Sequence, residues 1–253
     1  MKLLAFDCST ETLSIAVQNG GQVFSYDGAG GAQASSTMIP AIEKLMREAG
    51  LQYAQLDALV FGRGPGSFTG LRTACSVAQG LAFGAGIKVL PVDTLLVVAQ
   101  EAQLLLEASG QAHSRIVAAQ PKRIVAALDA RMGEVYADYY EFNSTSRSIY
   151  AGELLKKPQN LLDKLDSVPT LIAGNIRPAL DAQLSEAALA LPFIQALPTA
   201  RALLKLAPSL IAAGGLHDAE HALPLYIRDK VALTTLEREA QNTGREREAH
   251  NKP

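Results

Sequence analysis

The sequence predicts an α/β protein of two related lobes, each with a mixed sheet and flanking helices. In the first half, strand-length apolar runs and helical patterns follow one another in the order βββαβαβα. The second half begins as the first does: VAALD-ARMGE-VYADY resembles LLAFD-CSTET-LSIAV, with a strand, an Asp, a polar turn and a returning strand. The 253 residues are 48% hydrophobic and 19% charged, which is enough to build two lobes.

The first lobe is expected to span residues 1–107 and to open with an antiparallel meander. Asn19-Gly20 is a strong hairpin signal between its second and third strands. Apolar residues at helical spacing predict a helix over 38–49, with Ser36 or Thr37 as its cap. The remaining elements are three opening strands near 3–6, 12–17 and 23–26, strand 58–61, helix 71–85, strand 87–92 and helix 94–107.

The second, smaller lobe is expected to span residues 123–235, after a linker over 108–122. Residues 236–253 are charged, mixed in sign and poor in apolar side chains, so we expect a disordered tail. The elements predicted for this lobe are strands 124–128, 135–140, 148–154 and 170–173, and helices near 158–165, 176–188 and 199–213.

Composition favours a cytoplasmic protein. The formal net charge is −2, so the overall charge does not by itself indicate binding to nucleic acid. Cys8 and Cys75 lack metal-ligand spacing and are too few for a disulfide framework. No apolar run reaches the roughly 18–20 residues of a membrane span, and the first residues do not form a signal peptide.

A glycine-rich loop, FGRGPGSFTGLRT at residues 61–73, joins a strand to a helix, where phosphate often binds. It is not a Walker A loop, because Leu71-Arg72 stands where that motif needs Lys-Ser/Thr. The loop matches the dinucleotide-binding motif better, since its glycines follow a strand and open a helix and Asp93 lies about 20 residues later. Pro65 removes an amide donor, however, and Asp93 is suited to cap the next helix. We favour a tight turn whose glycines, Gly64, Gly66 and Gly70, let the chain pass close to another backbone.

Asp7 and Asp129 each end a predicted strand. In phosphotransferases with an actin-like fold, a strand-end Asp and the following turn help to hold Mg²⁺ and nucleotide. Here Cys8 follows Asp7 and Ala130 follows Asp129, in place of the Gly of that turn. We therefore favour turn-capping roles for both carboxylates.

Two hydrolase patterns are also weak. His217, Glu220 and His221 match the H-x-x-E-H zinc-peptidase motif, but Gly-Gly before them and Pro after them leave little room for a helix. No third ligand stands out. Ser67 lies in G-P-G-S-F, which is not a nucleophile elbow. We expect no catalytic residue, no metal and no cofactor in this chain.

The helix over 71–85 is unusual because small residues recur along it. Gly70, Ala74, Ala78 and Ala82 form a row at intervals of four, flanked by apolar side chains. Small ridges let another helix approach closely. A helix with so much small and apolar surface is expected to bury a second face against a partner.

Four motifs together resemble the TsaB (YeaZ) family of bacterial tRNA threonylcarbamoyladenosine synthesis. They are FGRGPGSFTGLR, the opening strand with Asp-Cys-Ser-Thr-Glu, LDARMGEVY at 128–136 and PLYIR at 224–228. The resemblance covers about residues 1–230. It implies two lobes of the actin/Hsp70-like (ribonuclease-H-like) fold, in a degenerate relative of the catalytic TsaD protein.

The resemblance implies a non-catalytic subunit. TsaD transfers threonylcarbamoyl to the adenosine next to the anticodon, TsaC makes the adenylate donor, and the ATPase TsaE joins the complex. Such a chain would meet tRNA only through the complex and form a homodimer when alone. The metal-binding histidine pair of TsaD is missing from PVDTLLVVAQEAQ at 91–103, and Ala34 stands where the family often has His.

Family members pair with TsaD through their first two helices, which implies a four-helix interface here. The interface residues expected on this basis are Met38, Ile42, Leu45, Met46, Gly70, Leu71, Ala74, Cys75, Ala78 and Ala82. Two other classes stay open at this point. One is an actin-fold ATPase or kinase, which would turn over nucleotide, and the other is a metallopeptidase.

Overall fold

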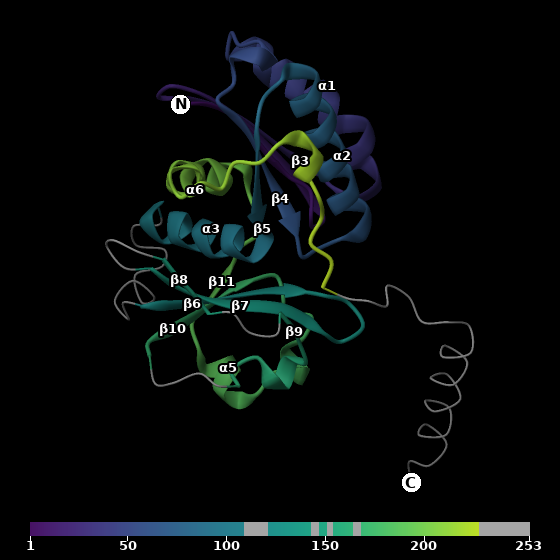
Figure 1. Ribbon diagram of the computed structural model, residues 1–253. Coiled ribbons are helices and arrows are strands. Elements are labelled where there is room, and N and C mark those ends of the chain that lie inside the picture. The colour runs from purple at the N-terminus through teal and green to yellow at the C-terminus, as the bar shows by residue number, and fades with distance from the viewer. Residues whose placement is uncertain (109–120, 143–146, 151–153, 164–167, 228–253) are drawn as a thin grey trace, which may run out of the picture.

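The computed structural model contains the two predicted sheets, one above the other in Figure 1. It describes residues 1–108, 121–142, 147–150, 154–163 and 168–227. The first sheet has the order β3-β2-β1-β4-β5 and is mixed, because β1 pairs antiparallel with β2 and parallel with β4. Its strands are β1 (Lys2–Asp7), β2 (Thr12–Asn19), β3 (Gln22–Ala29), β4 (Ala58–Gly64) and β5 (Val89–Asp93).

Helices cover both faces of this sheet, as Figure 1 shows. Because side chains alternate along a strand, Leu4 and Phe6 of β1 pack in one cluster with α1 and α2, while Leu3 and Ala5 pack in another with α3 and α6. All four side chains are fully buried, so β1 is the centre of the lobe. The helices are α1 (Ala34–Glu48), α2 (Phe68–Ala85), α3 (Thr94–Ala108) and α6 (Ala200–Ala212).

Two helix starts were predicted too late. The hydroxyls of Ser36 and Thr37 do not cap α1; they lie inside its first turns and donate to the Gln33 carbonyl. α2 begins at Phe68, where Ser67 is the N-cap. Gly70 hides that start in the sequence, because glycine is a poor helix former.

The second sheet repeats the topology of the first. Its main path, β11-β10-β6-β7-β8, has an antiparallel meander from β6 and a parallel neighbour in β10, as the first sheet has around β1. This confirms the internal repeat. Its strands are β6 (Arg123–Asp129), β7 (Val135–Phe142), β8 (Arg147–Tyr150), β9 (Leu155–Lys156), β10 (Thr170–Gly174) and β11 (Phe193–Gln195).

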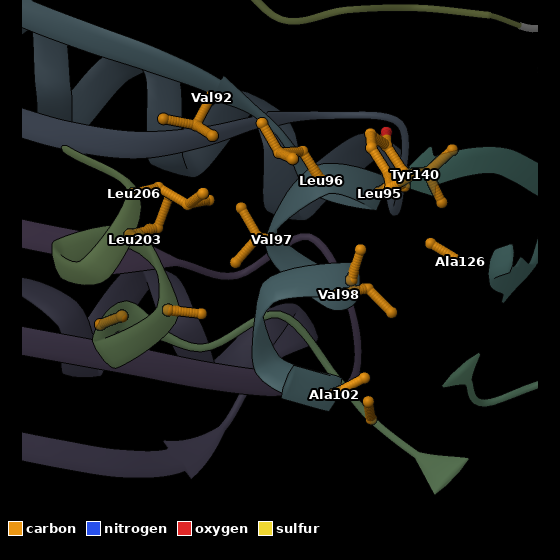
Figure 2. Packing of buried hydrophobic residues seen from close by; sticks show 14 of the residues in the cluster. Val92, Leu95, Leu96, Val97, Val98, Ala102, Ala126, Tyr140, Leu203 and Leu206 are labelled. Atoms are coloured by element: carbon orange, nitrogen blue, oxygen red, sulfur yellow. The ribbon is translucent and has the colours of Figure 1, made fainter. Parts of the chain in front are cut away.

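α3 joins the two lobes through a shared core. Residues 94–100 of this helix are all buried, as expected for a helix that is apolar on most of its surface. In Figure 2, Val97 lies near Leu203 and Leu206 of α6, while Leu95 lies beside Tyr140 of β7. The lobes are therefore packed through α3 across a continuous apolar cluster.

Several predictions for the second half need correction. α6 was assigned to the second lobe, but it contacts β1, β2 and β4 of the first sheet. The helix predicted over 176–188 is replaced by turns and the short α5 (Glu186–Ala190). Only a single 3-10 turn, Pro158–Asn160, is found in the described part of 158–165. The tail over 236–253 and most of the linker lie outside the described residues, and the lobe boundaries stay predictions.

Candidate functional site

The glycine-rich loop is packed against the chain that follows β1. Ser67 caps α2 by accepting from the Gly70 amide, and its own amide donates to the Ser9 carbonyl at 2.7 Å. The Cys8 thiol donates to the Gly70 carbonyl at 3.1 Å. Another amide, that of Gly64, donates to the Thr94 hydroxyl. Several polar groups of the loop therefore form hydrogen bonds with other parts of the protein.

These contacts explain why the loop needs glycine. A Cβ on Gly66 would lie 2.4 Å from the Ser9 carbonyl oxygen, and one on Gly70 would lie 1.9 Å from the Cys8 carbonyl oxygen. Gly64 has a φ of +117° and would bring a Cβ 2.7 Å from the Leu225 carbonyl oxygen. The interpretation of a close backbone approach is confirmed. The space that the missing side chains leave is filled by the protein's own backbone.

Asp7 is turned into the protein. Its Oδ1 accepts from the Ser9 amide at 2.8 Å and the Ser9 hydroxyl at 2.7 Å, which is the turn-capping role predicted for it. Its Oδ2 has no hydrogen-bond partner among the described residues and lies where a Cβ on Gly62 would fall, 1.7 Å away. Burial raises the pKa of Asp7 to about 6, against the opposing effect of the Ser9 hydrogen bonds.

The burial of Asp7 predicts a pH-dependent stability. The raised pKa means that the folded protein favours the protonated carboxyl, so the free energy of unfolding falls as pH rises from about 4 to about 6. Asp7→Asn removes the charge and keeps an acceptor for Ser9. We expect this variant to gain about 3 kcal/mol on wild type between pH 4 and pH 7. Urea unfolding at both pH values measures it, and a constant difference between the two proteins would refute the prediction.

Asp129, at the end of β6, is the counterpart of Asp7 in the second lobe. Its Oδ1 accepts from the Arg131 amide at 2.7 Å, again as a turn cap, and its Oδ2 lies 3.3 Å from the Arg131 guanidinium. Asp93 does not have the role predicted for it, because it accepts from Arg63 Nε at 2.6 Å across the sheet. The Asp93 carboxylate thus accepts its hydrogen bond from an arginine, where a bond from the amides at the start of the next helix was expected.

A cleft of about 540 Å³ opens beside the glycine loop, between the two lobes. Its first-lobe side includes Ser67 and Phe68 with Tyr226 of the C-terminal segment, and its second-lobe side includes Arg131 and Met132. The last two residues have positive φ angles of 63° and 57°. Such angles are uncommon outside glycine and often occur at functional positions. Sequence reasoning missed Phe68 and Tyr226, although Tyr226 lies in the PLYIR motif.

The ten residues expected at a partner interface are all buried within the chain itself. Each apolar side chain among them is at most 5% exposed, and Gly70 is buried too. The small row of α2 packs on the sheet, where it lets the helix approach β4. Partner contact through α1 and α2 stays a prediction, but the side chains that make such a contact must belong to the outward faces of these helices. Those faces carry Ile39, Glu43 and Arg47 on α1, and Arg72, Ser76, Gln79, Gly80, Phe83 and Gly84 on α2.

The remaining candidates for chemistry are two histidines and two cysteines. The rings of His217 and His221 lie 6.0 Å apart, and no set of three or more potential ligands in the described ranges is placed to hold a metal. Burial raises the pKa of Cys8 and of Cys75 to about 12, which makes both thiols poor nucleophiles. Within the described part of the chain, the helices are too short or too polar to span a membrane.

Comparison with known proteins gives consistent matches. The family model described as TsaD, tRNA N6-adenosine threonylcarbamoyltransferase, matches residues 31–235. The tRNA threonylcarbamoyladenosine biosynthesis protein TsaB of Escherichia coli (strain K12) is 32% identical over 93% of this chain and 98% of its own length. TsaB of Haemophilus influenzae is 40% identical over 54% of this chain and 52% of its own.

The fold comparison agrees. A solved structure of YeaZ from Pseudomonas aeruginosa superposes with a TM-score of 0.76 at 32% identity, covering 89% of this chain and 99% of that one. The two mixed sheets of like topology and their flanking helices fit the two-lobed actin-like architecture. The chain belongs to the TsaB (YeaZ) family, within the wider family that the TsaD model describes.

Proposed function

We propose that this protein is a partner of a TsaD-like enzyme in the synthesis of threonylcarbamoyladenosine on tRNA, and that it does not carry out the transfer itself. The observation that carries the proposal is the 32% identity to E. coli TsaB along nearly the whole of both chains. The TsaD-type family model across most of the chain supports a TsaD-related partnership. Because the proposed function acts on tRNA, we also propose that the protein is cytoplasmic.

The geometry of the glycine loop supports a non-catalytic role. In an actin-like phosphotransferase, the strand-end Asp and the turns around it face the nucleotide. Here Asp7 is 1% exposed and turned toward Gly62, and the backbone of Cys8 and Ser9 lies against the loop. These features disfavour an ATPase or kinase. The metallopeptidase alternative is disfavoured by the lack of a third ligand near His217 and His221 among the described residues.

For the partner surface we propose the outward face of α1 and the later part of the outward face of α2, from Ser76 to Gly84. Phe83 is 83% exposed there, and nothing lies within 4 Å of a Cβ built on Gly80 or on Gly84. A large apolar side chain beside two glycines suits close packing against another helix pair. The same face would serve a homodimer when the partner is absent. We expect a TsaE-like ATPase to join the assembled pair.

The test is direct assembly. The purified chain is mixed with the TsaD-like protein of the same organism and examined by size-exclusion chromatography with light scattering. We expect a complex with both chains, formed at the expense of the homodimer. No complex, together with ATP or peptide hydrolysis by this chain alone, would contradict the proposal.

A further inference from the structure

Two side chains at the start of α2 and one from the C-terminal segment form a cluster beside the cleft. Phe68 begins α2, Arg72 follows one turn later, and Tyr226 belongs to the C-terminal segment. The Arg72 guanidinium carbon lies 3.8 Å from the centre of the Phe68 ring. Its Nε donates to the Tyr226 hydroxyl at 3.0 Å, and the two aromatic rings are 5.5 Å apart. The cluster is therefore an arginine held between two aromatic side chains.

This cluster is tied to the first lobe and open to solvent. The Leu225 amide donates to the Arg63 carbonyl at 2.7 Å, which ties the segment carrying Tyr226 to the end of β4. Phe68 is 36% exposed and Tyr226 is 46% exposed. Since the exposed rings are already ordered, a ligand that stacks on them loses little further side-chain entropy.

The charge of Arg72 is available to a ligand. No carboxylate pairs with it in the part of the chain that the structure describes, and its recorded contacts are to the Phe68 ring and the Tyr226 hydroxyl. Only its Nε is used in the hydrogen bond, so its two terminal nitrogens remain as donors. A guanidinium fork of this kind matches a phosphate group.

The cleft beside the cluster is large enough for a base. Phe68 and Tyr226 both line the cleft of about 540 Å³, and Met132, which is 51% exposed, lines it from the second lobe. Ser67 and Asn175 add polar groups to the same lining. A planar ring could stack on the aromatic side chains in this space, with its edge toward polar groups.

We propose that the Phe68–Arg72–Tyr226 cluster binds one unpaired nucleotide of tRNA, with the base stacked on the exposed aromatic rings and a phosphate on Arg72. Stacking on aromatic rings beside an arginine is the usual way in which proteins hold unpaired RNA. This inference rests on the proposed function, which supplies tRNA as the ligand. With a net charge of −2, the chain alone should bind tRNA weakly, so the contact would act within the complex.

The experiment measures binding of unmodified tRNA by fluorescence anisotropy, for the complex with the TsaD-like protein and, at low salt, for this chain alone. We expect Tyr226→Ala to weaken binding about tenfold or more, and Arg72→Ala to weaken it and lower the salt slope by about one. Tyr226→Phe keeps the ring and should bind nearly as wild type. Arg201→Ala is the control, because Arg201 is an exposed arginine that contacts Ser25 away from the cleft.

Each outcome decides the proposal. Weaker tRNA binding by the alanine variants with assembly unchanged supports it. Unchanged tRNA binding overturns it, and so does loss of assembly, which would make the cluster a protein contact. Binding of AMP at the cluster without any binding of tRNA would assign the site to free nucleotides and overturn the RNA ligand. If the wild-type complex does not form, the proposed function fails. The measurements on this chain alone then test the cluster, and absence of RNA binding there overturns the proposed site.

Discussion

Gly80→Arg is expected to abolish binding to the TsaD-like partner and self-association together, while the monomer stays folded. Nothing lies within 4 Å of a Cβ at Gly80, so the chain itself has room for the new side chain. In the proposed interface, an arginine at this point would separate the helices and bury an unpaired charge. Overpacking and burial of a charge together should weaken the complex by about a hundredfold or more.

Matched variants separate this effect from a general loss of stability. Ala187→Arg places the same side chain on an exposed position of α5, in the second lobe, and should leave partner binding unchanged. Circular dichroism and thermal unfolding check that both variants are folded, and titration calorimetry measures their affinity for the partner. A folded Gly80→Arg protein with wild-type affinity would place the interface away from α2.

Gly70→Ala is expected to destabilise the protein by about 3 kcal/mol or more, or to prevent folding. The added Cβ would lie 1.9 Å from the Cys8 carbonyl oxygen, which is backbone and cannot move as a flexible side chain does. The chain after β1 or the start of α2 would have to shift. The same substitution would also lengthen or break the hydrogen bond from the Cys8 thiol to the Gly70 carbonyl.

Gly84→Ala is the control for that substitution, on the same helix. It is exposed, no atom lies within 4 Å of its Cβ, and alanine favours a helix over glycine by about 1 kcal/mol. We expect it to stabilise the monomer. Urea unfolding of the two variants compares them directly. Equal stabilities for Gly70→Ala and wild type would mean that the loop is not close-packed against Cys8.

The helix faces illustrate what the sequence can and cannot predict. Spacing correctly grouped Ala74 and Ala78 on one side of α2, but spacing does not say whether that side meets the protein's own sheet or a partner. Both side chains are fully buried, so Ala74→Leu and Ala78→Leu are expected to disturb the protein's own core. The interface prediction named the inner face because small and apolar residues suit either role.

Elements with strong local signals were predicted well. The meander around Asn19-Gly20 and the repeat after Asp7 and Asp129 depend on turns and strands that local residues determine. The turns over 176–188 were missed because the apolar residues of this segment recur at helical spacing. Pro178 nevertheless interrupts a helix there. The contact between Arg72 and Tyr226 joins residues 154 positions apart, and no local pattern can reveal it.

Reconstituted tRNA modification tests the central claim most directly. Unmodified tRNA is incubated with ATP, threonine, bicarbonate and the TsaC-, TsaD- and TsaE-like proteins, with and without this chain, and threonylcarbamoyladenosine is measured by mass spectrometry of the nucleosides. The account predicts modification only when this chain and the TsaD-like protein are both present. Full modification without this chain, or modification by this chain without the TsaD-like protein, would contradict it.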